Sequence, residues 1–211
     1  AKTVALAEID ARKAQLLAAA QMPVPGLEAG DDGLLLGGVP FGQASQAERL
    51  RCALAIAMPA MTDDNFSQTV TLICEHNPQG ALGLIINRPL DMQLSDIFRQ
   101  LRLPTSQERL SSQPVLQGGP VQTDRGFVVH RAEERTWDST LRVSDQVHVT
   151  TSRDILEAMS RGEGPSDAFV ALGYAGWEAG QLESEMIQNA WLSVAAAPNV
   201  LFGTPYEERW R

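Results

Sequence analysis

The fold is decided by residues 50–89, which read LRCALAIAMPAMTDDNFSQTVTLICEHNPQGALGLIINRP. Three short apolar runs, at 53–57, 69–76 and 81–87, lie in this stretch between turn residues. Such runs are typical of buried strands rather than helices. The tetrapeptide Asn77-Pro78-Gln79-Gly80 separates the last two runs and has the composition of a tight turn. The sequence therefore predicts an antiparallel hairpin.

The remaining chain to residue 211 shows short strands in runs, with helices inserted at a few points. Helices are predicted at 94–103, at 155–159 after a capping box at 151–154 with a stop at Gly162, and at 180–188. Residues 104–112 are predicted to form a polar loop. Strands are predicted at 115–116, 126–130, 137–143, 146–150, 169–172, 191–194 and 200–202. Because strict β-α alternation is absent, an α+β fold with a mostly antiparallel sheet is expected.

The N-terminal segment differs in composition from the rest. Residues 1–20 are rich in Ala and favour a helix, which Pro23 ends. Residues 22–47 are rich in Gly and Pro and are typical of an extended arm or linker. A simple tether is slightly favoured over an arm that packs through 34–36 on its own domain or on a neighbouring subunit. We therefore expect an extension over 1–47 and one domain over 48–211.

Composition narrows the classes of function. The chain has 211 residues and is 44% hydrophobic, as is usual for a globular protein. Its net charge of −9 disfavours binding to the phosphate backbone of a nucleic acid. Its two cysteines, Cys52 and Cys74, are too few for a disulfide framework and are expected to be reduced. The sequence shows no secretory pattern and no apolar stretch long enough to span a membrane, which predicts a cytoplasmic protein.

Several short motifs, taken in their order and spacing, resemble the AlgH/YqgE family of bacterial proteins over residues 50–210. The resemblance implies an α+β fold in which a bifurcated, largely antiparallel sheet closes into a small β-barrel flanked by helices. It implies no known reaction, and the family's label of transcriptional regulator stems from a link to alginate control. Residues 1–47 lie outside the resemblance. The motifs are 57–59 (AMP), 74–77 (CEHN), 83–89 (GLIINRP), 118–121 (GGPV), 124–127 (DRGF), 150–152 (TTS), 173–177 (GYAGW) and 180–183 (GQLE).

Cys74 is the first candidate for reaction chemistry. On a regular strand Cys74 would share a face with His76. Their side chains would lie about 7 Å apart, which is too far for a hydrogen bond between thiol and imidazole. His130 or His148 could instead reach Cys74 across the sheet, so a thiol-dependent enzyme or redox sensor is kept as the alternative. A buried, inert Cys74 is favoured. Cys74 and His76 provide only two zinc ligands, so neither a metal nor another cofactor is predicted. His130, Asp138 and Ser139 could be drawn as a hydrolase triad, but the sequence has no nucleophile-elbow motif to support it.

Two glycine loops, 117–120 and 173–177, match neither a phosphate loop nor a dinucleotide fingerprint. Barrel corners and bulges explain them without a ligand. The functional alternative is a shallow groove, which requires an exposed Trp177. Its candidate ligand-binding residues are Asn87, Arg88, Gly118, Gly119, Arg125, Tyr174 and Trp177.

The sequence thus favours a non-enzymatic binding or regulatory module. Its partner would be a protein or a small molecule that the sequence does not identify, and any role in transcription would be indirect. Direct DNA binding and membrane association are not expected, and the oligomeric state is not predicted.

Overall fold

The computed structural model of the protein describes residues 27–30, 33–36, 39–40, 50–104 and 108–210. The chain divides into two compact units, Ala1–Ala44 and Ser45–Arg211. The helix predicted over 1–20 lies outside the described residues. Within the described part of the chain, no helix is long and apolar enough to cross a membrane.

The described residues of the first unit form three short strands, β1 (Leu27–Gly30), β2 (Gly33–Leu36) and β3 (Val39–Pro40). They form an antiparallel sheet in the order β1-β2-β3. The sequence predicted only an extended arm here, because strands of two to four residues are too short to show a clear two-residue period.

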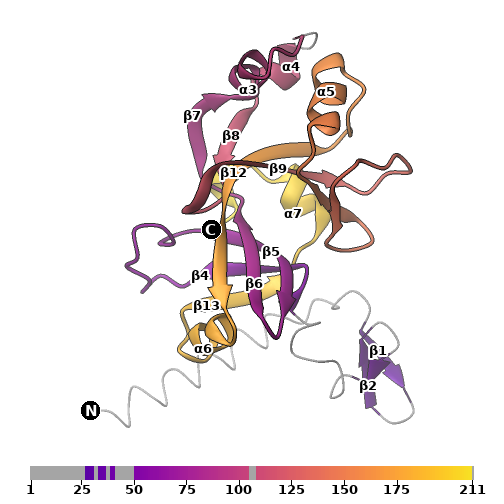
Figure 1. Ribbon diagram of the computed structural model, residues 1–211. Coiled ribbons are helices and arrows are strands. Elements are labelled where there is room, and N and C mark those ends of the chain that lie inside the picture. Colours follow the sequence, from indigo (N-terminus) through magenta and orange to yellow (C-terminus); the bar gives the residue numbers. More distant parts are fainter. Residues whose placement is uncertain (1–26, 31–32, 37–38, 41–49, 105–107, 211) are drawn as a thin grey trace. The chain divides into compact units, whose positions relative to one another are not determined.

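The second unit is built on one large sheet in the order β10-β11-β9-β12-β6-β5-β4-β13, in which β8 pairs with both β7 and β12. Among the described strands, only the β8–β12 pairing is parallel, and the sheet curls into a half-barrel (Figure 1). The predicted α+β fold is confirmed. The strands are β4 (Ala53–Ala57), β5 (Val70–Asn77), β6 (Gly80–Ile85), β7 (Pro89–Gln93), β8 (Pro114–Gln117), β9 (Val121–Arg131), β10 (Thr140–Arg142), β11 (Val147–Thr150), β12 (Ala168–Glu178) and β13 (Trp191–Ala195).

The predicted hairpin forms between β5 and β6, with Asn77 paired to Gly80. The side chain of Asn77 accepts a hydrogen bond from the Gln79 N–H at 2.8 Å, which fixes the turn. A register shift between Ile73 and Glu75 places a β-bulge at Cys74.

Helices cover opposite ends of the half-barrel. Figure 1 shows α3, α4 and α5 at one end and α6 at the other, with the long strands β9 and β12 between them. The helices are α3 (Leu94–Gln100), α4 (Glu108–Ser111), α5 (Arg153–Arg161), α6 (Gln181–Ile187) and α7 (Pro198–Gly203), and a 3₁₀ turn, η1, spans Tyr206–Glu208.

Three hydrophobic clusters fill the unit, and β12 contributes to all of them. The inner cluster includes Leu72, Cys74, Leu84, Val129, Phe169 and Ala171. The α3/α5 cluster includes Phe98, Val128, Ile155, Met159 and Val170. The α6 cluster includes Ile73, Ala175, Trp177, Leu182 and Trp191. Because successive residues of a strand face opposite sides, one strand can serve separate cores.

One carboxylate holds α6 against the sheet. The indole N–H groups of Trp177 and Trp191 both donate to Oε2 of Glu185, at 3.0 and 2.8 Å. On the same helix, Glu183 contacts Nε2 of His76 at 2.9 Å. These polar contacts orient the helix above its apolar face.

Arg209 is a buried cation held by main-chain oxygens. Its guanidinium donates hydrogen bonds to the carbonyls of Ile86, Leu201 and Thr204. It also lies over the ring of Tyr206, 4.5 Å from the centroid. Burial lowers the pKa of Arg209 to about 10, so the side chain remains charged at neutral pH. Arg209 thereby ties the segment after α7 to the end of β6.

Two predicted elements are wrong. The strand predicted at 200–202 belongs to α7, because Pro198 stands in the first turn, where proline favours a helix start. The predicted polar loop at 104–112 contains the short helix α4 in its described part.

Two further predictions hold only in part. The strand predicted at 137–143 is reduced to β10, because Trp137 is buried in the α3/α5 cluster instead of the sheet. The N-cap of α5 is Ser152 and not Thr151, so the predicted capping box does not form, although Gly162 ends the helix in the left-handed conformation.

Candidate functional site

Cys74 is a buried thiol of the core. Its side chain is fully buried in the inner cluster, and its Sγ lies 3.5 Å from the Leu72 carbonyl. Burial raises the pKa of the thiol far above its usual value, which suppresses the nucleophilic thiolate.

The expectation that Cys74 and His76 share a face is wrong. The bulge at Cys74 reverses the alternation of side chains, so that Cys74 packs in the inner cluster while His76 pairs with Glu183 of α6. Bulges insert one extra residue into a strand and therefore re-aim the side chains that follow.

We expect native-state alkylation to leave Cys74 unlabelled until the protein unfolds. Cys52, which is half-buried, provides the internal comparison and should label first. Mass spectrometry of peptides after timed exposure to iodoacetamide measures both rates. Labelling of Cys74 at the rate of Cys52 would contradict a buried thiol and restore the thiol-dependent alternative.

His130 and His148 face each other across β9 and β11, with ring centroids 5.8 Å apart. His130 is buried, and its Nδ1–H donates to the Arg131 carbonyl at 2.9 Å. Its Nε2 then accepts from the Thr150 hydroxyl, also at 2.9 Å. Among the described residues, no hydrogen bond joins Cys74 to either histidine. His130 is therefore a satisfied core histidine.

The neutral state of His130 makes stability depend on pH. Burial, together with His148, lowers the pKa of His130 below the unfolded value of about 6.5. The unfolded chain therefore binds more protons than the folded one as pH falls through 6.5, and the free energy of unfolding decreases there. NMR titration of the His130 ring should give a pKa below 6.5, which His148→Gln raises by removing a neighbouring charge. A titration at or above 6.5 would contradict this environment.

Asn87 and Arg88 tie the loop before β5 to the end of β6. The side chain of Asn87 accepts from the Val70 N–H at 2.8 Å and donates to the Gln68 carbonyl at 2.9 Å. Arg88 donates to two further carbonyls of this loop. Both residues line a cavity of about 440 Å³ that also includes Ser67, Gln68, Glu207 and Trp210.

The two glycine loops cross each other in direct backbone contact. Gly118 donates its N–H to the Leu172 carbonyl at 2.7 Å, and a Cβ at Gly118 would lie 2.3 Å from the Gly173 oxygen. A Cβ at Gly119 would lie 2.1 Å from the carbonyl carbon of Tyr174. Close approach explains why these positions need glycine.

The predicted aromatic groove is not assembled. Trp177 is only 6% exposed and packs in the α6 cluster, whereas Tyr174 packs edge-on against Phe127 at the inner cluster. Arg125 lies over Phe127, 5.4 Å from its centroid. β12 continues through the second glycine loop, so its alternation directs Tyr174 and Trp177 to opposite faces.

A different site lies between α3, α5 and the sheet. It is a cavity of about 460 Å³ whose floor is formed by Gly126 and Val128 of β9 and by Val170 and Leu172 of β12. The walls come from β7, α3, the end of β11 and α5. They comprise Met92, Ile97, Gln100, Leu101, Thr150, Thr151, Ser152, Arg153 and Leu156, with Thr123 and Asp124 at one end. Apolar surfaces with a few polar groups at the rim are typical of ligand sites.

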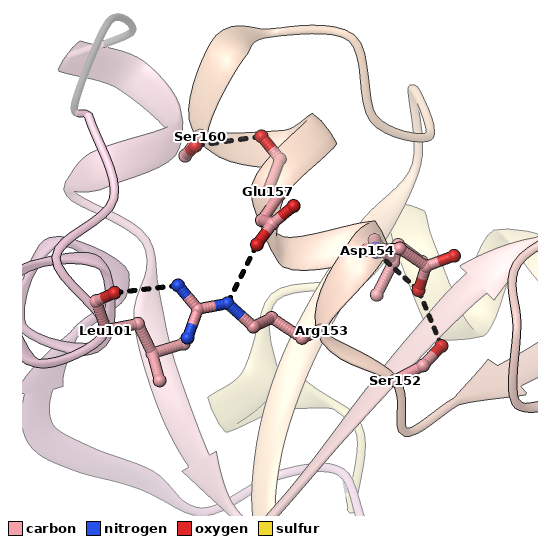
Figure 2. A network of polar contacts seen from close by, with 7 residues as sticks. Leu101, Ser152, Arg153, Asp154, Glu157 and Ser160 are labelled. Atoms are coloured by element: carbon pink, nitrogen blue, oxygen red, sulfur yellow. Dashed lines mark hydrogen bonds and ion pairs between the residues drawn. The ribbon is translucent and has the colours of Figure 1, made fainter.

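Arg153 bridges the two helices at this cavity. Figure 2 shows its guanidinium between Leu101, whose carbonyl accepts a hydrogen bond at 3.1 Å, and Glu157, whose carboxylate lies 2.8 Å away. At the start of α5, Ser152 donates to Asp154 at 2.6 Å. Glu157 thus balances the positive charge of Arg153.

The sequence did not identify this cavity. Asp124, Gly126 and Thr150–Ser152 belong to two motifs of the family resemblance, but these motifs are separated along the chain. Only the pairing of β9 with β11 brings the second motif beside the first. Among the described residues, no group of three His, Cys, Asp or Glu side chains is arranged to hold a metal ion.

Comparisons with known proteins agree on one family. The model of the AlgH-like family matches residues 54–211. A UPF0301 protein of Xanthomonas campestris is 53% identical over 158 residues, covering 75% of this chain and 84% of the relative. The solution structure of AlgH from Pseudomonas aeruginosa is 46% identical, with a TM-score of 0.67, over 79% of this chain and 88% of that one. A crystal structure of a Corynebacterium diphtheriae protein, at 19% identity and a TM-score of 0.61, shares the fold.

Proposed function

The chain belongs to the AlgH-like family. We propose that it is a non-enzymatic binding module whose ligand enters the cavity between α3 and α5. The observation that carries the proposal is this cavity of about 460 Å³, with its apolar floor and its polar rim. Its volume lies in the range of about 300–1,000 Å³ that is usual for ligand sites.

The state of the reactive side chains supports binding rather than catalysis. The Cys74 thiol is buried with a raised pKa, and both ring nitrogens of His130 are engaged in hydrogen bonds. A nucleophile needs a base within hydrogen-bond reach and access to substrate. Regulation by this module would then act through a bound partner, and the net charge of −9 supports an indirect effect on transcription.

The substitution Gly126→Val tests the site. A Cβ at Gly126 would lie 3.9 Å from Leu172 Cδ2, its nearest neighbour, and this glycine is not among those with positive φ. A Cβ at this position therefore meets no clash, and we expect the branched side chain of valine, which suits a strand, to fill part of the cavity floor. Gly176→Val is the matched control, because Gly176 is an exposed strand glycine outside the cavity.

NMR screening with a library of aromatic fragments gives the readout. We expect fragments to shift the amide signals of Val128, Leu156 and Val170, and we expect Gly126→Val to weaken this binding by tenfold or more. Gly176→Val should bind as the natural chain does. Fragments that bind elsewhere, or that bind Gly126→Val unchanged, would overturn the proposal.

A further inference from the structure

Strand β13 stands at one end of the large sheet. It pairs with β4 over five consecutive residues, Trp191–Ala195, without a register shift. Within the part of the chain that the structure describes, no strand pairs with its other side. β13 is therefore a regular edge strand that presents a row of unpaired main-chain groups.

The hydrogen bonds to β4 show which main-chain groups of β13 point outward. The Ala190 carbonyl accepts from the Met58 N–H at 3.0 Å, and the Ala196 N–H donates to the Cys52 carbonyl at 3.1 Å. In an antiparallel ladder, residues bonded to the neighbouring strand alternate with residues whose N–H and C=O point away from it. The even-numbered residues of β13 therefore face β4. The outward-facing residues are Trp191, Ser193 and Ala195.

The edge is apolar and uncharged. Leu192 and Val194 are 42% and 38% exposed, and they lie on the sheet face that also carries Leu54 and Ile56 of β4. Residues 186–206 contain no Asp, Glu, Lys, Arg or His, although the chain as a whole has a net charge of −9. Two copies of this edge can therefore meet without placing like charges opposite each other.

Among the described strands of the large sheet, β10 and β7 also stand at edges, and both are protected. β10 has only three residues, and the carbonyl of its charged residue Arg142 accepts a hydrogen bond from the Arg51 guanidinium. β7 begins with Pro89 and contains Asp91. Short length, charge and proline are features that prevent association through sheet edges. β13, by contrast, is five residues long, uncharged and without proline.

We propose that the edge of β13 binds a second copy of this chain, by antiparallel pairing of the two β13 strands about a two-fold axis. The axis passes between the two copies of Ser193, which exchange a pair of N–H···O bonds. Trp191 of each copy pairs with Ala195 of the other. The Ala195 carbonyl already accepts from the Ala197 N–H and has a second lone pair for the Trp191 N–H.

This register is self-complementary, as a two-fold interface requires. Leu192 of one copy lies opposite Val194 of the other, in a pair without main-chain hydrogen bonds, where side chains approach most closely. The two exposed apolar side chains of each copy thereby cover those of its partner. The inference goes beyond the proposed binding function and does not depend on the cavity.

The chain should associate reversibly. Five residues of each copy form a small interface, so we expect a weak dimer whose sedimentation coefficient rises between about 10 µM and about 1 mM protein. In a mixture of isotope-labelled and unlabelled chains, NMR should detect contacts between Leu192 of one copy and Val194 of the other. A chain that stays monomeric over this range, or a dimer without these contacts, would overturn the inference.

Ser193→Pro removes the central donor of the interface. Because this N–H points away from β4, we expect the fold to tolerate proline, which edge strands accept at such positions. The dissociation constant of the dimer should rise by at least about tenfold. Thermal unfolding of the variant checks that its fold is intact. A folded Ser193→Pro chain that dimerises as the natural chain does would refute the pairing of the two edges.

Leu192→Lys and Val121→Lys form a matched pair that does not rely on proline. Val121 is 37% exposed and begins β9, so both variants replace an exposed apolar side chain and add one positive charge. Leu192→Lys should weaken the dimer by at least about fivefold, because it places a charge opposite Val194 of the partner copy. Val121→Lys should change the affinity by less than about twofold. Equal effects would show that association depends on general charge or hydrophobicity and would refute the proposed interface.

Discussion

Replacing Gly173 with alanine is expected to destabilise the protein by about 4 kcal/mol or more. Gly173 has φ of +75°, in the left-handed region that L-residues avoid. A Cβ there would also lie 2.5 Å from the Gly119 oxygen and 3.0 Å from the Val121 oxygen. Both neighbours are backbone atoms of the crossing loop, so they can yield only if the contact between the loops opens.

Gly180→Ala separates the two causes. Gly180 has nearly the same φ, +74°, but a Cβ there meets nothing within 4 Å. The free energy of unfolding of Gly180→Ala should therefore fall by only about 1–2 kcal/mol, which is the cost of placing an L-residue at this φ. Urea unfolding followed by circular dichroism measures both variants. Equal losses would show that the loop crossing contributes nothing beyond backbone conformation.

Replacing Arg209 with methionine is expected to lower the free energy of unfolding by roughly 3–5 kcal/mol. Methionine retains much of the apolar stem but leaves the carbonyls of Ile86, Leu201 and Thr204 without their donor. Each buried carbonyl that loses its partner costs about 1–3 kcal/mol. Arg209→Lys should show an intermediate loss, because a single ammonium replaces the guanidinium fork.

Arg142→Met is the matched control for this prediction. Arg142 is an exposed arginine, and its side chain pairs only with Asp145 at the surface among the described residues. Such pairs contribute about 0–1 kcal/mol. The midpoints of thermal unfolding of the three variants can be compared directly. If the midpoint of Arg209→Met fell no further than that of Arg142→Met, the buried cation would not stabilise the fold.

Local chemistry explains which elements were predictable from the sequence. The β5–β6 hairpin followed from the turn at 77–80, and the end of α5 followed from Gly162. These signals act between residues that are adjacent in the chain. The strand predicted at 200–202 failed because its three apolar residues fit a strand or a helix equally well, and Pro198 decided between them.

Long-range pairing explains what the sequence did not reveal. The glycines near Trp177 predict a loop at this position. β12 nevertheless continues through Trp177, whose side chain is buried beneath α6. Asp124 and Thr150 are 26 positions apart and come together only because β11 lies against β9. A cavity made from a strand edge and two helices leaves no periodic signal in any one segment.

The pairing of β4 with β13 also has a consequence for how the chain acquires its structure. β4 is the first strand of the large sheet in the sequence and β13 is the last, and five residues of each are matched in register. The β5–β6 hairpin needs only neighbouring residues, so it can form while the chain is still being synthesised. One side of β4 must wait until residue 195 has left the ribosome. Such late, distant contacts slow folding and leave an apolar strand open to chaperones in the meantime.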